Sequence, residues 1–274
     1  MKIFFLLLVS LVALSLEISS TNIENGKTAL IVFDNSQNIK ELKVDKKTYK
    51  VFPHPSEKEK SYALLPVSYY ESPKTLKVKM KEQYLFFKVE QGDYKKETIE
   101  VQKSKVNPKS DAVKKRTSKE YANAMKIYNT ITPKNYVNSK FIVPLDSKIT
   151  SAFGKARVYN GSLKGYHSGT DFRAKIGTPI IASNDGKVVL AKDRFYSGNS
   201  IIIDHGEGIY TCYYHLSEFK VHKGDIVRKG QVIGLSGDTG RITGPHLHFS
   251  ARVGGIQVDP LQLITLLNNN LYKD

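Results

Sequence analysis

The sequence predicts a mostly β protein in which a helical linker joins a small N-terminal β-sandwich to a C-terminal β-sheet domain. Short runs of β-branched and aromatic residues alternate with turn residues from Lys27 to Val101. Residues 103–119 are lysine-rich with almost no large apolar side chains, and after Pro133 glycines become frequent as short β-branched runs return. The expected divisions are a signal peptide at 1–20, a β domain at 21–102, a lysine-rich linker and helix at 103–133, and a C-terminal domain at 134–274.

The first residues have the layout of a secretory signal peptide. Lys2 precedes an uncharged apolar run from Ile3 to about Leu16, which is short for a membrane-spanning helix, and small and polar residues follow. Cleavage after Ser15 or nearer Ser20 fits this pattern, and an uncleaved membrane anchor is the alternative. We therefore expect an exported protein of the periplasm or cell envelope, with no stable membrane span after cleavage.

The net charge limits the classes of partner, and the single cysteine excludes an internal disulfide. The chain has 42 Lys and Arg against 26 Asp and Glu, and this net charge of +16 attracts polyanions such as cell wall, anionic lipid or nucleic acid. Export and the lack of an RNP or helix-turn-helix pattern argue against nucleic acid. Cys212 is the one cysteine, so no internal disulfide forms, and its strand-like surroundings predict a small buried side chain. We expect a monomer.

Roughly seven short strands are predicted in the N-terminal domain, as in a small β-sandwich. In TLKVKM, lysines alternate with apolar residues, as expected for a strand with one face in water. The predicted strands include 28–33, 48–52, 62–67, 75–80, 84–90 and 97–101. This domain shows no motif that suggests chemistry, and His54, between two prolines, is expected to be inert.

Helical spacing follows the lysine-rich segment. One stripe of a predicted helix at 118–131 consists of Tyr121, Ala124, Met125 and Tyr128. Ser118 is placed to cap the N-terminus of this helix. We expect the helix to pack between the two domains, and binding of a partner is the alternative.

Short β-branched runs between glycine turns predict that the C-terminal domain is also all-β. These runs lie at 178–183, 186–191, 199–205, 208–216 and 231–237. Residues 223–234, KGDIVRKGQVIG, are similar to the tight hairpin of biotinyl or lipoyl carrier domains. A carrier needs its lysine at an exposed hairpin tip between small or Met residues, and no lysine here has that setting, which disfavours the carrier alternative.

Four histidines and one aspartate of the C-terminal domain have the spacing of a metal site. His167 and Asp171 are four residues apart in a segment whose glycine and threonine disfavour a helix, so both side chains are expected on one face. His246 and His248 would share a face of a strand, and His215 ends another strand. Catalytic zinc takes three His or carboxylate ligands and keeps a fourth position for water. His167, Asp171 and either His246 or His248 therefore form a candidate ligand set. The two spare histidines would serve proton transfer. A single such histidine is more often a packed or surface residue, but their joint occurrence favours a metal.

The segments SAFGKARVYNGSLKGYHSGTDF and TGPHLHF, with CYYHL between them, resemble the LytM/lysostaphin family of zinc metallopeptidases. The resemblance runs from about Ser151 to Pro260 and implies a LytM-type β-sheet peptidase domain. It implies that Zn²⁺ is held by His167, Asp171 and His248, and that His215 and His246 are catalytic.

The family resemblance also implies a substrate, the peptide crosslinks of bacterial peptidoglycan and their stem peptides. An extra N-terminal domain is typical of Gram-negative relatives that cut D-alanyl–meso-diaminopimelate bonds, and D,D-carboxypeptidase trimming is a second action of such a site. The family's FGxR pattern appears one residue longer, as FGKAR, which makes Arg157 a candidate for binding a stem-peptide carboxylate. Some members are inactive wall-binding or amidase-regulating modules, but this sequence retains every ligand. A further hypothesis is that the N-terminal sandwich covers the cleft and restrains activity.

Overall fold

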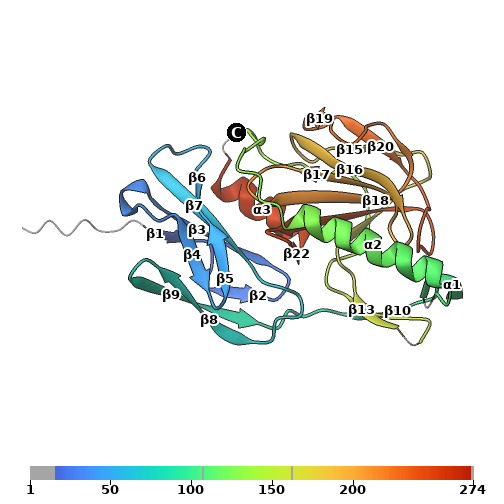
Figure 1. Ribbon diagram of the computed structural model, residues 1–274, viewed down its shortest axis with the longest axis horizontal. Coiled ribbons are helices and arrows are strands. Elements are labelled where there is room, and N and C mark those ends of the chain that lie inside the picture. Colours follow the sequence, from blue (N-terminus) through green and yellow to red (C-terminus); the bar gives the residue numbers. More distant parts are fainter. Residues whose placement is uncertain (1–15, 107, 162, 273–274) are drawn as a thin grey trace, which may run out of the picture.

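The computed structural model describes residues 16–106, 108–161 and 163–272. It confirms the predicted fold class, because a β-sandwich and a second β domain lie side by side with helix α2 running along the second domain (Figure 1). Within the described residues, no helix is long and apolar enough to cross a membrane. The predicted signal segment falls mainly on residues 1–15, which lie outside the described residues, whereas strand β1 begins at Leu16.

The N-terminal domain consists of two sheets packed face to face around a shared apolar core. The strand order is β1-β3-β7-β6 in one sheet and β2-β9-β8-β4-β5 in the other. The first sheet contains β1 (Leu16–Ile18), β3 (Thr28–Asp34), β7 (Lys60–Pro66) and β6 (Phe52–Pro53), and a short 3-10 helix, η1 (Asn35–Gln37), follows β3. The second contains β2 (Asn22–Glu24), β9 (Gln83–Glu90), β8 (Lys74–Met80), β4 (Glu41–Val44) and β5 (Lys47–Lys50).

Strand β3 is buried on both faces, which explains its unbroken apolar sequence ALIVF. Ile31 and Phe33 point into the core between the two N-terminal sheets, whereas Leu30 and Val32 belong to the core of the C-terminal domain. Alternate side chains of a strand point to opposite faces, so this one strand joins two cores. The first sheet is therefore enclosed between the second sheet and the C-terminal domain.

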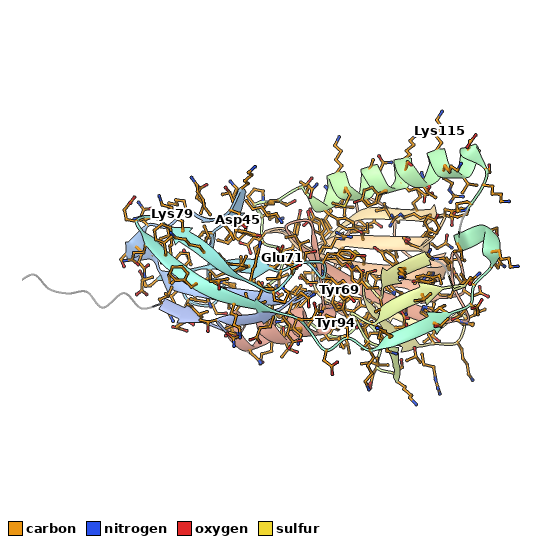
Figure 2. The ribbon with its side chains drawn as sticks, turned by 90° about the horizontal axis from the view of Figure 1, so that it is seen from below. Asp45, Tyr69, Glu71, Lys79, Tyr94 and Lys115 are labelled. Carbon is orange, nitrogen blue, oxygen red and sulfur yellow. The ribbon has the colours of Figure 1, made fainter. Side chains whose placement is uncertain are left out.

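After β9 the chain pairs with the C-terminal domain before any helix begins. Strand β10 (Lys96–Ile99) lies parallel to β12 (Ala156–Tyr159), which forms a hairpin with β13 (Leu163–Tyr166). The prediction that the strand at 97–101 belongs to the N-terminal sandwich is therefore wrong. Figure 2 shows Tyr69 near the junction of the two domains, and its ring stacks on that of Tyr166 with centroids 3.9 Å apart.

The lysine-rich segment is mostly helical, which corrects the expectation of a linker up to residue 119. It contains α1 (Lys103–Val106) and α2 (Asp111–Tyr128). Ser110 is the N-cap residue of α2 and Ser118 lies inside the helix, so the predicted cap is wrong. Lysine and alanine have high helix propensity, so a scarcity of apolar residues did not mean a loop here.

Helix α2 packs along the sheet of the C-terminal domain and not between the domains as predicted. Ala124 and Tyr128 are buried against Tyr210 and Cys212 of that sheet. Tyr121 is 66% exposed, so it does not belong to the buried stripe. The chain thus runs out along β10, turns through α1, and returns along α2 to the domain junction (Figure 1).

The C-terminal domain is built on a ten-stranded sheet whose main path is β11-β14-β21-β18-β17-β16-β19. Its strands are β11 (Ile149–Ser151), β14 (Thr170–Arg173), β21 (His246–Val253), β18 (Ile209–Phe219), β17 (Gly198–Asp204), β16 (Gly186–Arg194), β19 (Ile226–Val227), β15 (Pro179–Ile181), β20 (Val232–Ser236) and β22 (Ile256–Val258). β19 pairs with β16, whereas β20 pairs with β15 and β18, so residues 223–234 do not form the expected tight hairpin.

Helix α3 (Pro260–Asn270) lies between the two domains and contacts both β3 and β21 (Figure 1). The Gln262 side chain accepts a hydrogen bond from the Thr28 N–H at 3.1 Å and donates one to the Thr28 carbonyl at 2.9 Å. His54 Nε2 lies 3.0 Å from the carbonyl oxygen of Asn270. His54 is therefore a buried residue that fastens the end of α3 to the N-terminal domain.

Candidate active site

The predicted metal ligands face one another across two neighbouring strands. Asp171 on β14 is paired in the ladder with His248 on β21, and His167 precedes β14. Asp171 Oδ1 lies 2.9 Å from His167 Nε2 and 2.8 Å from His248 Nδ1, and these two nitrogens are 3.0 Å apart. The three side chains are buried, and their ligand atoms lie within 4.8 Å of one another. The structure thus brings together three residues that were selected from the sequence.

Strand β21 turns both histidines of HLH toward the same face. Leu247 and Phe249 are fully buried on the opposite face, which is the expected alternation. His246 Nε2 lies 3.5 Å from Asp171 Oδ1, farther than His248 Nδ1. His248 is therefore the member of the pair that joins the cluster, and His246 borders it.

Gly169 lies against the cluster, although it was not predicted as a site residue. A Cβ atom at this position would lie 2.3 Å from the carbonyl oxygen of Phe249 and 2.6 Å from His248 Nε2. Only glycine allows the backbone before β14 to approach β21 this closely. The signal in the sequence was a glycine between the two residues of the HxxxD motif.

Hydrogen bonds outside the cluster determine which imidazole nitrogen faces it. His167 Nδ1 donates to the carbonyl oxygen of Ala152 at 2.8 Å, and this bond fixes the ring so that Nε2 is the nitrogen that faces Asp171. The His248 ring lies almost parallel to that of Tyr214, with planes 6° apart and centroids 5.4 Å apart. These contacts orient both imidazoles before any ligand binds.

The cluster fits the ligand preferences of zinc. Two imidazole nitrogens and one carboxylate oxygen form a typical catalytic set, and tetrahedral bonds of about 2.0–2.1 Å place such atoms about 3.3 Å apart. The separations of 2.8–3.0 Å are close to that value. A cavity of ≈ 140 Å³ lined by His215 and His248 opens beside the cluster, so a fourth position is accessible.

Two further histidines stand at the edge of the cluster. The ring centroids of His215 and His246 are 5.1 Å apart, and His215 is 6.1 Å from His248. His215 Nδ1 donates to the carbonyl of Thr239 at 2.7 Å, and His246 Nδ1 donates to that of Gly244 at 2.8 Å, which leaves each Nε2 as a proton acceptor. His215 also has a φ of 63°, a strained backbone region that is frequent at functional sites.

Burial and mutual contacts set the protonation states of the cluster. Burial lowers the pKa of His215 to about 3, and the nearby His246 and His248 add to this effect. Burial lowers the pKa of His248 to about 4 although Asp171 opposes the change. Burial alone would raise the pKa of Asp171, but hydrogen bonds with His167 and His248 outweigh it and hold that pKa well below its usual value. At neutral pH the Asp171 carboxylate is thus ionised and the His248 imidazole is neutral, and cation binding requires these states of a carboxylate and an imidazole ligand.

Arg157, on β12, lines the same cavity as His215. Its Nε donates to Glu97 Oε1 at 2.6 Å and its Nη2 donates to Asp171 Oδ2 at 3.1 Å. Two internal carboxylates therefore contact the guanidinium that was predicted to bind a stem-peptide carboxylate. Glu97 was not selected from the sequence, because it lies in a segment assigned to the N-terminal sandwich.

The cavity beside the cluster is lined by the C-terminal domain. Its lining residues are Arg157, Tyr159, Tyr166, Ser168, Tyr196, Ser197, Tyr214, His215, Arg241 and His248. No described residue of the N-terminal domain lines the cavity, although Tyr69 reaches its wall by stacking on Tyr166. This geometry gives no support to the hypothesis that the N-terminal sandwich covers the cleft.

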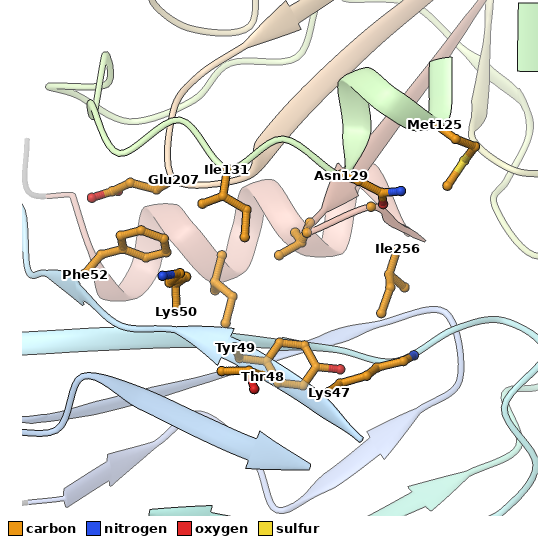
Figure 3. Close-up of a pocket in the computed structure, with 14 residues that line it drawn as sticks. Lys47, Thr48, Tyr49, Lys50, Phe52, Met125, Asn129, Ile131, Glu207 and Ile256 are labelled. Carbon is orange, nitrogen blue, oxygen red and sulfur yellow. The ribbon is translucent and has the colours of Figure 1, made fainter. Parts of the chain in front are cut away.

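A larger cavity of ≈ 430 Å³ lies between β5 and the C-terminal end of α2, where Tyr49 faces Met125 and Asn129 (Figure 3). Its walls are mainly apolar, and Glu207 contributes a carboxyl group. None of the six predicted site residues lines it. The larger cavity therefore lies apart from the predicted site residues.

The other histidines of this domain and the cysteine have structural positions. His205 is buried, with Nδ1 2.7 Å from the Asp185 carbonyl and Nε2 2.7 Å from Thr211 Oγ1. His222 is exposed at a turn. Cys212 is a free, buried residue, which confirms its prediction as a small core side chain.

Known proteins share the sequence around this cluster. Residues 165–260 match peptidase family M23. The C-terminal domain belongs to this family. This chain is 46% identical over 122 residues to the peptidoglycan DD-endopeptidase ShyA of Vibrio cholerae, a match that covers 43% of this chain and 28% of ShyA. It is 45% identical over 97 residues to the DD-carboxypeptidase/endopeptidase Mpg of Neisseria meningitidis, which covers 35% of this chain and 22% of Mpg. The matches span less than a third of either relative.

The likeness to one solved structure extends beyond the M23 domain. A crystal structure described as peptidase M23 from Pseudomonas aeruginosa superposes with a TM-score of 0.66 at 27% identity. The superposition covers 86% of this chain and 93% of that chain. The arrangement of an N-terminal sandwich against an M23 domain is therefore common to both proteins.

Proposed function

We propose that this protein is a zinc-dependent endopeptidase that hydrolyses peptide crosslinks of bacterial peptidoglycan, in particular D-alanyl–meso-diaminopimelate bonds. The observation that carries this proposal is the convergence of His167 Nε2, Asp171 Oδ1 and His248 Nδ1 within 4.8 Å. Relatives named DD-endopeptidase and DD-carboxypeptidase/endopeptidase support the choice of substrate. The apolar N-terminal run supports export, so the proposed place of action is the periplasm, and the proposed state is a monomer.

His167, Asp171 and His248 would hold the zinc ion, which when bound supplies Lewis-acid activation of water and of the scissile carbonyl. His215 and His246 are the proposed acid–base groups, because their Nδ1 atoms are held by carbonyl oxygens and their Nε2 atoms remain proton acceptors. One of these rings takes a proton from the attacking water, and the resulting imidazolium donates to the oxyanion or to the leaving amine. Such help contributes about 10²–10⁴ in rate.

Digestion of purified crosslinked muropeptide dimers, followed by mass spectrometry, tests the proposal. We expect zinc-loaded protein to convert dimers to monomers, and expect a chelator or His248→Ala to abolish the products. Loss of a terminal D-alanine from pentapeptide stems would add a D,D-carboxypeptidase action. If zinc-loaded protein yields no product from either substrate, the endopeptidase proposal is wrong, and the inactive wall-binding or amidase-regulating alternative gains support.

A further inference from the structure

Glu97 connects the segment before the M23 domain to the metal cluster. It lies on β10, outside residues 165–260, and the parallel register of β10 and β12 places it directly beside Arg157. Glu97 Oε1 accepts a hydrogen bond from Arg157 Nε at 2.6 Å, and Oε2 accepts one from Lys155 Nζ at 3.1 Å. Ser151 Oγ lies 3.2 Å from Oε1. Three donors thus hold this carboxylate in one orientation.

The Arg157 guanidinium hydrogen-bonds both Glu97 and Asp171 and so connects their orientations. Its Nη2 donates to Asp171 Oδ2 at 3.1 Å, while Oδ1 of the same carboxylate faces His167 Nε2 and His248 Nδ1. The guanidinium is planar and rigid, so fixing Nε through Glu97 also fixes where Nη2 points. The Arg157 side chain is 12% exposed, so little water competes for these bonds. The two oxygens of Asp171 therefore have separate partners, one on the arginine and one in the cluster.

We propose that Glu97 is a positioning residue of the metal centre, which acts through Arg157 to hold Asp171 with Oδ1 turned toward the two imidazoles. The inference rests on the metal site of the proposed function, although it does not depend on the substrate. Mutation of a residue that orients a metal ligand through hydrogen bonds typically weakens metal affinity about 10–100-fold. Glu97 therefore makes the segment between the two domains part of the site.

Zinc affinity, measured in the full chain by competition with a chromophoric chelator, tests this role. We expect Glu97→Ala to weaken zinc binding about 10-fold and Arg157→Ala to weaken it at least as much. Glu97→Gln keeps an acceptor for Arg157 Nε and should recover part of the loss. Glu100→Ala removes an exposed carboxylate from the same segment and should leave the affinity unchanged.

The double variant Glu97→Ala/Arg157→Ala separates action through Arg157 from independent effects. If Glu97 acts through the arginine, the double variant binds zinc as weakly as Arg157→Ala alone. If the losses of zinc affinity in the two single variants multiply in the double variant, the proposal is overturned. An unchanged zinc affinity in Glu97→Ala also overturns it. A Glu97→Ala protein with unchanged zinc affinity and faster cleavage would overturn it in favour of a carboxylate that competes with substrate for Arg157. Zinc binding without muropeptide cleavage in the parent protein would defeat the proposed function and leave this inference intact.

Discussion

Replacing Glu207 with glutamine should abolish a loss of folding stability at alkaline pH that arises at the junction between the two domains. Glu207 lies in the turn between β17 and β18 with only 6% of its surface exposed, and Tyr62 of β7 donates a hydrogen bond to its Oε2 at 2.6 Å. Burial raises the pKa of Glu207 from 4.5 to about 7, although the Tyr62 hydrogen bond opposes the change. The folded protein therefore binds a proton here more tightly than the unfolded chain does.

The sign and size of the effect follow from linkage. Because the folded pKa is the higher one, the contribution of Glu207 to stability is complete below pH 4.5 and is lost as the pH rises through about 7. Each pKa unit corresponds to about 1.4 kcal/mol, so the free energy of unfolding should fall by roughly 3 kcal/mol at alkaline pH. Glutamine is neutral throughout and still accepts from Tyr62, so Glu207→Gln should abolish this fall.

Thermal or urea unfolding of parent and Glu207→Gln at about pH 5 and about pH 8 measures the difference. The two proteins should be similarly stable at the lower pH, and the variant should melt about 5 °C or more higher at the upper pH. His205, whose pKa burial lowers to about 4, destabilises both proteins equally in acid, so the comparison cancels it. Glu100→Gln, on the surface, should follow the parent at both pH values. A variant that is no more stable than the parent at pH 8 would refute this reasoning.

Substitutions beside the cluster of His167, Asp171 and His248 give further predictions. Gly169→Ala places a Cβ 2.3 Å from the Phe249 carbonyl and 2.6 Å from His248 Nε2, so zinc affinity should fall about 10–100-fold, whereas Gly244→Ala, which meets no atom within 4 Å, should bind zinc normally. Equal zinc affinities of the two glycine variants would show that the close approach of the backbone at Gly169 to β21 does not determine the position of His248. His246→Ala should retain zinc and lose about 10²–10⁴ in muropeptide cleavage rate, and a loss of zinc from this variant would instead make His246 a ligand.

Local patterns in the chain predicted much of the cluster. The two-residue period of a strand predicted that His246 and His248 share a face, because this alternation depends only on backbone geometry. It could not decide which of the two joins the cluster, and the family resemblance supplied that choice. The start of α2 was misplaced by several residues, because exposed lysines stabilise a helix without marking its buried face.

By itself, the sequence determined the mostly β class of the protein, its basic character and the short-range spacing of the histidines and aspartate, because these properties depend on composition and on neighbours a few residues apart. Only the tertiary structure decided that β3 serves two cores, that Gly169 must lack a side chain, and that Glu97 meets Arg157 from 60 residues away. Such contacts depend on strand pairing and domain packing between distant segments, and no local pattern encodes which distant partner a strand edge or a carboxylate will meet.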